Sequence, residues 1–236
     1  MNNIVEKIRK ILIENIDEKT RDTAQNFFKE KIKYYGVKVI LVTKISKEIF
    51  SEIKDYPKKD IFDICEGLWK SGYSEESYIA ANLAYYIHEQ YEPGDFEIFA
   101  HWVESYVDNW ASCDSLCNHA VGTFIEMYPQ YIDRLKGWTK SENRWMKRAS
   151  AVTLIIPARK GLFLNDIFEI ADTLLHDTDD LVQKGYGWML KAASEYHQKE
   201  VYEYVLLKRN TMPRTAYRYA LEKMPPEWRN EAMKRE

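Results

Sequence analysis

The sequence predicts an all-α protein built from stacked helices, and two observations lead to this fold class. Glycine and proline, which form many turns, are scarce: the 236 residues include only 9 Gly and 7 Pro. Apolar residues recur at helical spacing along nearly the whole chain, and polar breaks interrupt them roughly every 15–20 residues. Helices joined by short loops account for this pattern better than strands do.

The expected helices follow from apolar stripes with the 3.6-residue period of an α-helix. In chain order, the stripes cover Ile4–Leu12, Ile61–Trp69, Ile79–Ile87, Phe96–Tyr106, Val121–Tyr128, Asn165–Leu175 and Leu181–Ala193. Two runs with strand-like composition, Val37–Thr43 and Thr153–Pro157, abut strong helix formers, and we interpret both as helix.

Residues that favour helix ends mark two more helices. Ser141–Asn143 precede the helix that contains Trp145. Thr211 and Pro213 open a helix over Arg214–Lys223, because proline is tolerated in a first helical turn, and two prolines that follow end it.

The spacing of the breaks sets the expected architecture. Two consecutive helices with their loops make a unit of about 35–40 residues, which is the size of a HEAT-type repeat. No sequence motif repeats strictly, so we infer the repeat from helix spacing alone. We expect residues 1–236 to form a single domain, a HEAT-like superhelix (α-solenoid), because stacked repeats share one continuous core.

Charge is distributed unevenly around a formal net charge of −3. Residues 1–50 carry 11 Lys and Arg against 7 Asp and Glu, residues 51–133 carry 4 against 16, and residues 134–236 carry 19 against 14. A superhelix with two basic ends can grip a phosphate backbone along a concave, DNA-binding face, with the acidic segment toward solvent. The alternative is chance clustering of charges on exposed helix faces.

The composition also indicates where the chain works. Three cysteines and no signal peptide indicate reduced thiols in a cytoplasmic protein. No apolar run approaches the roughly 18 residues that a membrane span needs. We therefore expect a cytoplasmic monomer with no membrane partner.

The first candidate site is the helical run that begins at Asn109. Trp110 and Asp114 are four residues apart, so a helix places an indole and a carboxylate on one face, and Asn118 extends this polar line. An aromatic ring beside an acid suits a positively charged sugar or base. The alternative is a half-buried Trp with an Asp that the helix dipole favours near the N-terminus.

Eight cations are candidates for contacts with DNA phosphates. They occur near the start of the Trp145 helix, beside Trp188, one turn apart after Pro213, and in the basic N-terminal segment: Arg144, Lys147, Arg148, Lys184, Lys191, Arg214, Arg218 and Lys38. Solvated basic faces are the alternative for these clusters.

Two glycines flank Tyr186 within the predicted Leu181–Ala193 helix. Gly185 and Gly187 each cost a helix about 1 kcal/mol relative to Ala. We expect the close approach of another helix or of a ligand backbone to offset this cost.

Metal and cofactor chemistry is not expected. Cys113, Cys117 and His119 lack a second Cys or His pair at zinc spacing. The sequence contains neither a phosphate-binding glycine loop nor a Gly-x-Ser-x-Gly motif.

Three runs together resemble the bacterial AlkD family of DNA alkylation repair enzymes. They are Trp110-x-x-x-Asp114, Ser141 to Ala149 (SENRWMKRA) and Gln183 to Trp188 (QKGYGW). The similarity covers roughly residues 28–224, and it implies a HEAT-like superhelix that removes N3- and N7-alkylated purines from duplex DNA without a metal or redox cofactor.

The resemblance also implies roles for individual residues. Trp110 and Trp188 match the two cleft tryptophans of the family, Asp114 its catalytic carboxylate, and Arg148 the arginine that grips the DNA backbone. The chain departs from the family where relatives have a polar residue and a proline after an early glycine, because Val37 and Lys38 follow Gly36 here.

Three functions are consistent with these residues. The first is a DNA glycosylase in which Asp114 stabilises an oxocarbenium-like sugar and orients the attacking water. The second is a non-catalytic, damage-sensing relative that binds DNA with the same scaffold. The third is a HEAT-type scaffold for protein interactions, for which the acidic segment 51–133 would be the natural surface.

Overall fold

The computed structural model describes residues 2–234, with side chains from residue 3 on, and their regular structure is helical. A single isolated backbone bridge, between Lys33 and Tyr73, is the nearest approach to a sheet in this range. This confirms the predicted all-α class. The chain forms two compact units, one up to Phe124 and one from Ile125 on, and each is described by itself.

The first unit begins with two helices and continues with longer hairpins. Its elements are α1 (Asn2–Glu14), α2 (Glu18–Ala24), α3 (Val39–Ile53), α4 (Lys58–Trp69), α5 (Ser74–Tyr86), α6 (Asp95–Tyr106) and α7 (Trp110–Leu116), and α8 (Gly122–Met127) crosses the boundary. Short 3₁₀ turns cover Gln25–Phe27 and His88–Gln90, and a π-helical turn covers Cys117–Val121.

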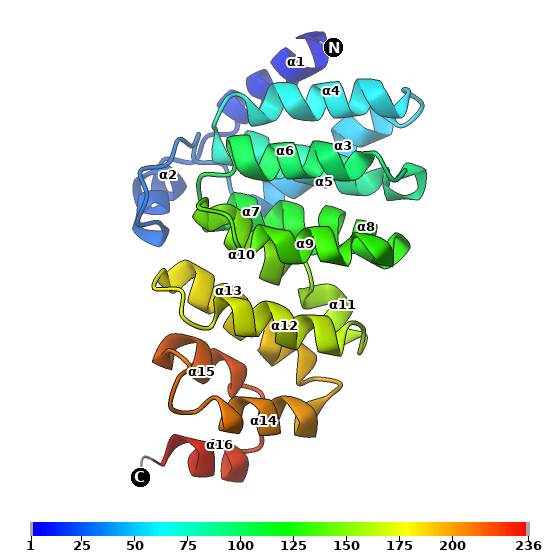
Figure 1. Cartoon of the computed structure of the whole chain (residues 1–236). Coiled ribbons are helices and arrows are strands. Elements are labelled where there is room, and N and C mark those ends of the chain that lie inside the picture. The colour runs from blue at the N-terminus through cyan, green and yellow to red at the C-terminus, as the bar shows by residue number, and fades with distance from the viewer. Residues whose placement is uncertain (1, 235–236) are drawn as a thin grey trace. The chain divides into compact units, whose positions relative to one another are not determined.

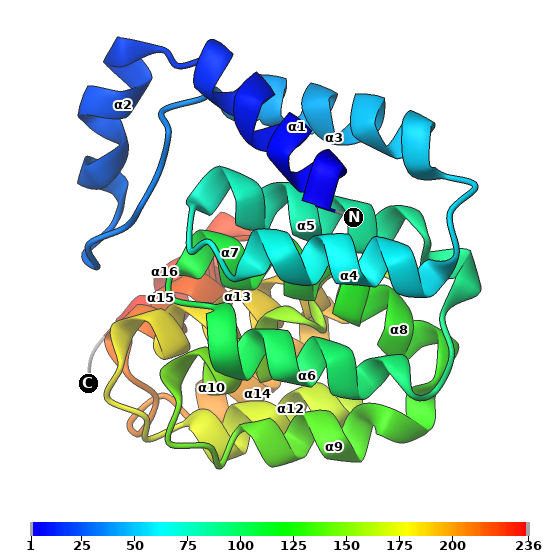
Figure 2. The ribbon, with the colours of Figure 1, turned by 90° about the horizontal axis from the view of Figure 1, so that it is seen from above.

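Two layers of helices make up the first unit from α4 on. α4 and α6 lie side by side in one layer, while α5 and α7 form the other (Figures 1 and 2). α5 packs against α3, α4 and α7, and its alanine-rich surface allows these close approaches. α4 and α6 meet through buried aromatic side chains, with Phe62 of α4 edge to face against Phe99 and Trp102 of α6.

The second unit repeats this two-layer arrangement. Its elements are a 3₁₀ turn (Pro129–Tyr131), α9 (Ile132–Trp138), α10 (Arg144–Val152), α11 (Ile155–Arg159), α12 (Leu164–Leu174), α13 (Asp180–Ala193), α14 (Gln198–Leu207), α15 (Arg214–Ala220) and α16 (Pro226–Met233). α9 packs beside α12 in one layer, and α10, α13 and α15 follow one another in the other (Figure 1). The spacing of the polar breaks in the sequence predicts a helical-repeat protein, in which helical hairpins stack in layers as they do here.

The segment between the 3₁₀ turn Gln25–Phe27 and α3 contains no helix, and Glu75 on α5 holds it in place. The buried Glu75 carboxylate accepts backbone N–H groups from Tyr35 (3.0 Å), Gly36 (2.8 Å) and Val37 (3.1 Å). Gly36 has a φ of 93°, and an added Cβ would collide with Arg21, so a glycine is required at this turn.

Most predicted helices and breaks are confirmed, with local corrections. The run Val37–Thr43 becomes helical only at Val39, and the helix that begins at Arg214 ends at Ala220 rather than Lys223. The residue that caps α10 is Asn143, whose side-chain oxygen accepts the Trp145 N–H. Thr211 does not cap α15, because its hydroxyl donates to the Lys208 carbonyl oxygen. None of the described helices combines the length and the hydropathy that a membrane span requires.

Candidate functional site

Trp110 and Asp114 lie on one helix, α7, as their spacing predicts. The Asn109 side chain caps this helix by accepting the Ser112 N–H at 2.9 Å. Both Trp110 and Asp114 are only partly buried, whereas Trp69 and Trp102 of the same unit are 1% and 0% exposed. The Trp110 indole is therefore not a core side chain.

The Trp110 indole is held by the segment that precedes α3. Its Nε1–H donates to the Phe27 carbonyl oxygen (3.2 Å), and the Phe28 ring stacks on it with centroids 5.4 Å apart and planes inclined by 19°. These contacts fix the plane of the indole. Sequence reasoning missed Phe28 as a site residue, because it lies about 80 residues before Trp110 and no local pattern connects the two.

Asn118 extends the polar line of α7 into the π-helical turn Cys117–Val121. Its Oδ1 is buried, and no hydrogen-bond partner for it occurs in the described part of the chain. The side chains of Cys113 and Cys117 are fully buried. Residues 2–234 include no cluster of three or more His, Cys, Asp or Glu side chains placed to hold a metal ion.

Trp188 lies on α13 of the second unit and is also partly exposed. Among the described residues its indole has neither a stacked ring nor a hydrogen-bond partner. Lys184, one turn earlier, is paired with Asp180 (3.2 Å). Lys191, one turn later, is paired with Glu222 (3.0 Å), and its ammonium lies 5.5 Å from the centroid of the Tyr219 ring.

The two glycines of α13 are explained by neighbouring helices. A Cβ on Gly187 would lie 2.8 Å from the Tyr219 Cβ and 2.9 Å from the Ala216 Cα, so α13 and α15 touch there. A Cβ on Gly185 would lie 3.3 Å from the Arg148 Cγ, on α10. The expected close approach is therefore helix packing at both positions.

The basic cluster at the start of α10 is packed and ion-paired within its own unit. Arg148 is 5% exposed, and its Nη1–H donates to the Leu181 carbonyl oxygen. Arg144 pairs with Asp179 (2.7 Å), and Lys147 pairs with Asp177 (2.9 Å). A phosphate would have to displace these partners to reach the cluster.

The remaining candidate cations differ in how they are held. Arg214 and Arg218, one turn apart on α15, are exposed and have no ion-pair partner among the residues described. Lys38 pairs with Asp17 at 3.1 Å. The Thr20 hydroxyl and N–H, followed by Lys38, lower the pKa of Asp17 to about 2, so this carboxylate stays charged in acidic solution well below its ordinary pKa of 3.8.

Comparisons with known proteins point to one family. The family model described as DNA alkylation repair enzyme matches residues 8–224. A solved structure, the predicted DNA alkylation repair enzyme from Enterococcus faecalis, has the same fold, with a TM-score of 0.79 at 17% sequence identity over 90% of this chain and 98% of that chain. No curated protein sequence matches the chain.

Proposed function

Because the chain belongs to the DNA alkylation repair enzyme family, we propose that it is a DNA glycosylase that excises purines alkylated at N3 or N7 from duplex DNA. This proposal rests on one face of α7, which Trp110 and Asp114 share. An indole and a carboxylate, both partly exposed, occupy it, while the other tryptophans of that unit are buried. A cationic nucleotide is a ligand that such a pair attracts.

The chemistry of the lesion sets what the protein must supply. Alkylation at N3 or N7 makes the purine cationic, and a cationic purine is already a good leaving group. Catalysis therefore depends on stabilising the oxocarbenium-like sugar as the glycosidic bond breaks. Asp114 would do so through its negative charge and would orient the attacking water, a contribution of about 2–4 kcal/mol for a preorganised group.

Trp110 and Trp188 would position the lesion. The Phe28 ring covers one face of the Trp110 indole, so the nucleotide would meet the other face. The electron-rich faces of both indoles would attract the developing positive charge of the sugar. Contact through the deoxyribose and backbone would make the site tolerant of bulky adducts.

Phosphate contacts would come mainly from the second unit. Arg214 and Arg218 carry charges that no described acid neutralises, so they are the readiest to bind a phosphate. The paired cations Lys38, Arg144, Lys147, Lys184 and Lys191 would exchange a carboxylate for a phosphate. Arg148 would join them when its guanidinium turns away from the Leu181 carbonyl.

The whole chain would take part in this reaction, which needs only DNA and water. Residues 1–236 would act as one domain and as a monomer in the cytoplasm, with duplex DNA and water as the reactants. The proposed reaction uses neither a metal nor a redox cofactor, because a cationic purine is already a good leaving group and needs no further activation.

Base release from methylated duplex DNA tests this function. The protein should release 7-methylguanine or 3-methyladenine faster than the bases are lost spontaneously, as measured by chromatography of the ethanol-soluble fraction. Salt-dependent binding of the same duplex without release would instead indicate the non-catalytic relative. Failure to bind duplex DNA even at low salt would leave only the protein-interaction scaffold.

A further inference from the structure

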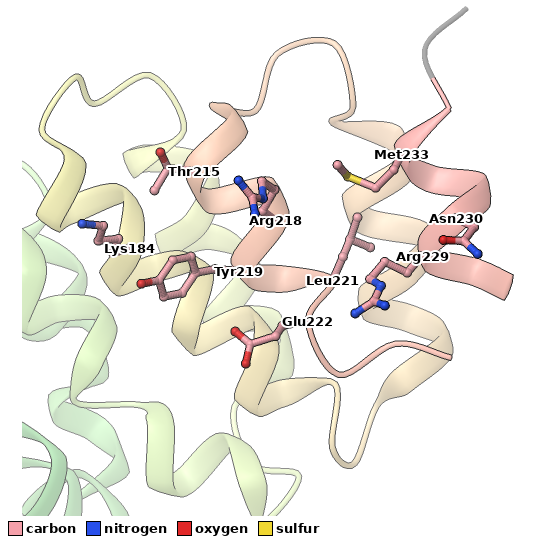
Figure 3. A pocket seen from close by; sticks show the side chains of 9 residues that line it. All are labelled: Lys184, Thr215, Arg218, Tyr219, Leu221, Glu222, Arg229, Asn230 and Met233. Atoms are coloured by element: carbon pink, nitrogen blue, oxygen red, sulfur yellow. The ribbon is translucent and has the colours of Figure 1, made fainter. Parts of the chain in front are cut away.

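A cavity of about 640 Å³ opens between α13, α15 and α16 in the second unit. Figure 3 shows Lys184 on α13, Arg218 on α15, and Arg229 with Asn230 on α16 around this cavity, which we call the C-terminal pocket. Its volume lies within the range of pockets that hold small ligands, about 300–1,000 Å³. It can therefore hold more than a single bare ion.

The lining of the C-terminal pocket has an excess of positive charge. Arg218 and Arg229 have no acidic partner within the described part of the chain. Glu222 is the acid of the lining, and Lys191 pairs with it at 3.0 Å. Lys184 is balanced by Asp180. Two arginines thus remain without a counter-charge in one cavity.

The other groups of the pocket suit a sugar–phosphate chain. The Asn230 side chain offers an amide donor, and the ring of Tyr219 forms an aromatic wall near Lys184 (Figure 3). Arginine binds phosphate oxygens through its planar array of N–H donors, two at a time in the best geometry.

The pocket adjoins the helix that carries Trp188. Lys184 lies four residues before Trp188 on α13, which is about 6 Å along the helix axis. Successive phosphates of one DNA strand advance by about 3.4 Å along the duplex axis. A strand that reaches Trp188 can therefore bring a phosphate to the pocket within a few nucleotides.

Arg229 and Asn230 lie outside the region that the family model matches. That match ends at Met224, whereas α16 begins at Pro226. The wall that α16 contributes is therefore not among the features that assign this chain to its family.

We propose that the C-terminal pocket binds a phosphodiester of duplex DNA between Arg218 and Arg229, a few nucleotides from the alkylated base. This inference rests on the proposed function for its choice of partner. It adds Arg229 and Asn230 of α16 to the DNA-binding surface and makes the pocket a phosphate site separate from the base-excision residues.

The salt dependence of binding to an undamaged duplex tests the pocket. Each phosphate contact contributes about 0.9 to the slope of log K against log salt concentration. Arg229→Gln should make this slope shallower by about 0.9 and weaken binding several-fold at low salt. Because the side chain is exposed, the thermal midpoint of unfolding should stay at the parent value.

Lys223→Gln is the matched control, since it removes one exposed positive charge near α16 but does not line the pocket. It should leave the slope unchanged. An unchanged slope in Arg229→Gln, or equal changes in both variants, overturns the proposal. Thermal stabilisation by inorganic phosphate, measured at constant ionic strength, is the second test. If phosphate stabilises the parent but not Arg229→Gln, and the two proteins have equal slopes with DNA, the pocket binds free phosphate and the assignment to DNA is wrong.

Base release separates this inference from the proposed function. If the parent releases no base and the slope still changes in Arg229→Gln, the glycosylase proposal fails and the phosphate pocket stands. If bases are released and the slope does not change, only the pocket fails.

Discussion

Tyr186 lies in the middle of α13 with its side chain fully buried between the two glycines. Its hydroxyl group has no hydrogen-bond partner among the residues described. Burial, with a smaller effect from Asp177, raises the pKa of this phenol, so the group is neutral. A buried, unpaired hydroxyl costs about 1–3 kcal/mol of stability.

Tyr186→Phe removes this hydroxyl without changing the packing of the ring. We expect the free energy of unfolding to stay the same or to rise by about 1 kcal/mol, because the desolvation cost disappears. Urea denaturation of the two proteins measures the difference. A loss of more than 1 kcal/mol would mean that the hydroxyl has a partner, and this explanation of Tyr186 would be wrong.

Asp17 links α2 to Lys38 through its charge. Its pKa is lowered to about 2, first by the Thr20 hydroxyl and N–H and then by Lys38, from an ordinary value of 3.8. A lowered pKa stabilises the folded state above the ordinary value, and this stabilisation is lost as the pH falls through about 2.

Asp17→Asn keeps the helix cap but removes the charge. The parent should therefore be more stable than this variant at pH 5, and the difference should shrink below pH 3.8 and disappear once the pH is below about 2. Thermal midpoints of both proteins across this range provide the measurement. A difference that does not shrink between pH 5 and pH 2 would rule out the charge as its origin.

At the scale of elements, the contact between α13 and α15 depends on Gly187. A Cβ there would lie 2.8–2.9 Å from Tyr219 and Ala216, including the Ala216 backbone, which cannot move aside as a side-chain tip can. Overpacking of this kind costs about 1–3 kcal/mol.

Gly187→Ala should accordingly lower the free energy of unfolding by about 1–3 kcal/mol in urea denaturation. Gly185→Ala is its counterpart on the same helix, where the new methyl meets the Arg148 side chain at 3.3 Å. It should cost less, because that side chain can adjust and alanine favours the helix by about 1 kcal/mol. Equal costs in the two variants would contradict the packing reason given for Gly187.

The elements that sequence predicts well are those with a local cause. Apolar periodicity located most helices, and the four-residue spacing of Trp110 and Asp114 placed both on α7. Caps were placed a few residues off, since several residues near a helix start can offer a side-chain oxygen.

Features with a distant cause could not be predicted from local pattern. The segment before α3 is fixed by Glu75, about 40 residues later, and it positions Phe28 against Trp110. The acids that neutralise Arg144 and Lys147 follow them by 30 residues or more. Burial of Arg148 beneath α13 likewise depends on tertiary packing, so composition alone made this cluster look like an open basic face.

At the scale of the whole molecule, charge is divided between the parts of the chain in a way that suits the proposed reaction. Trp110 and Asp114 belong to the acidic segment 51–133, which would attract the cationic lesion of the proposed reaction and repel phosphates. Seven of the candidate phosphate-binding cations belong to the basic segment 134–236. One region would thus stabilise the developing sugar cation, and the other would hold the backbone.

The central claim is that the Asp114 carboxylate stabilises the sugar as the base leaves. Single-turnover release of 7-methylguanine by Asp114→Asn tests it most directly, with Asp133→Asn, an exposed acid on α9, as the control. We predict that Asp114→Asn folds and binds DNA but releases the base about 30- to 1,000-fold more slowly, equivalent to about 2–4 kcal/mol, while the control keeps the parent rate. Release by Asp114→Asn at the parent rate would contradict the account.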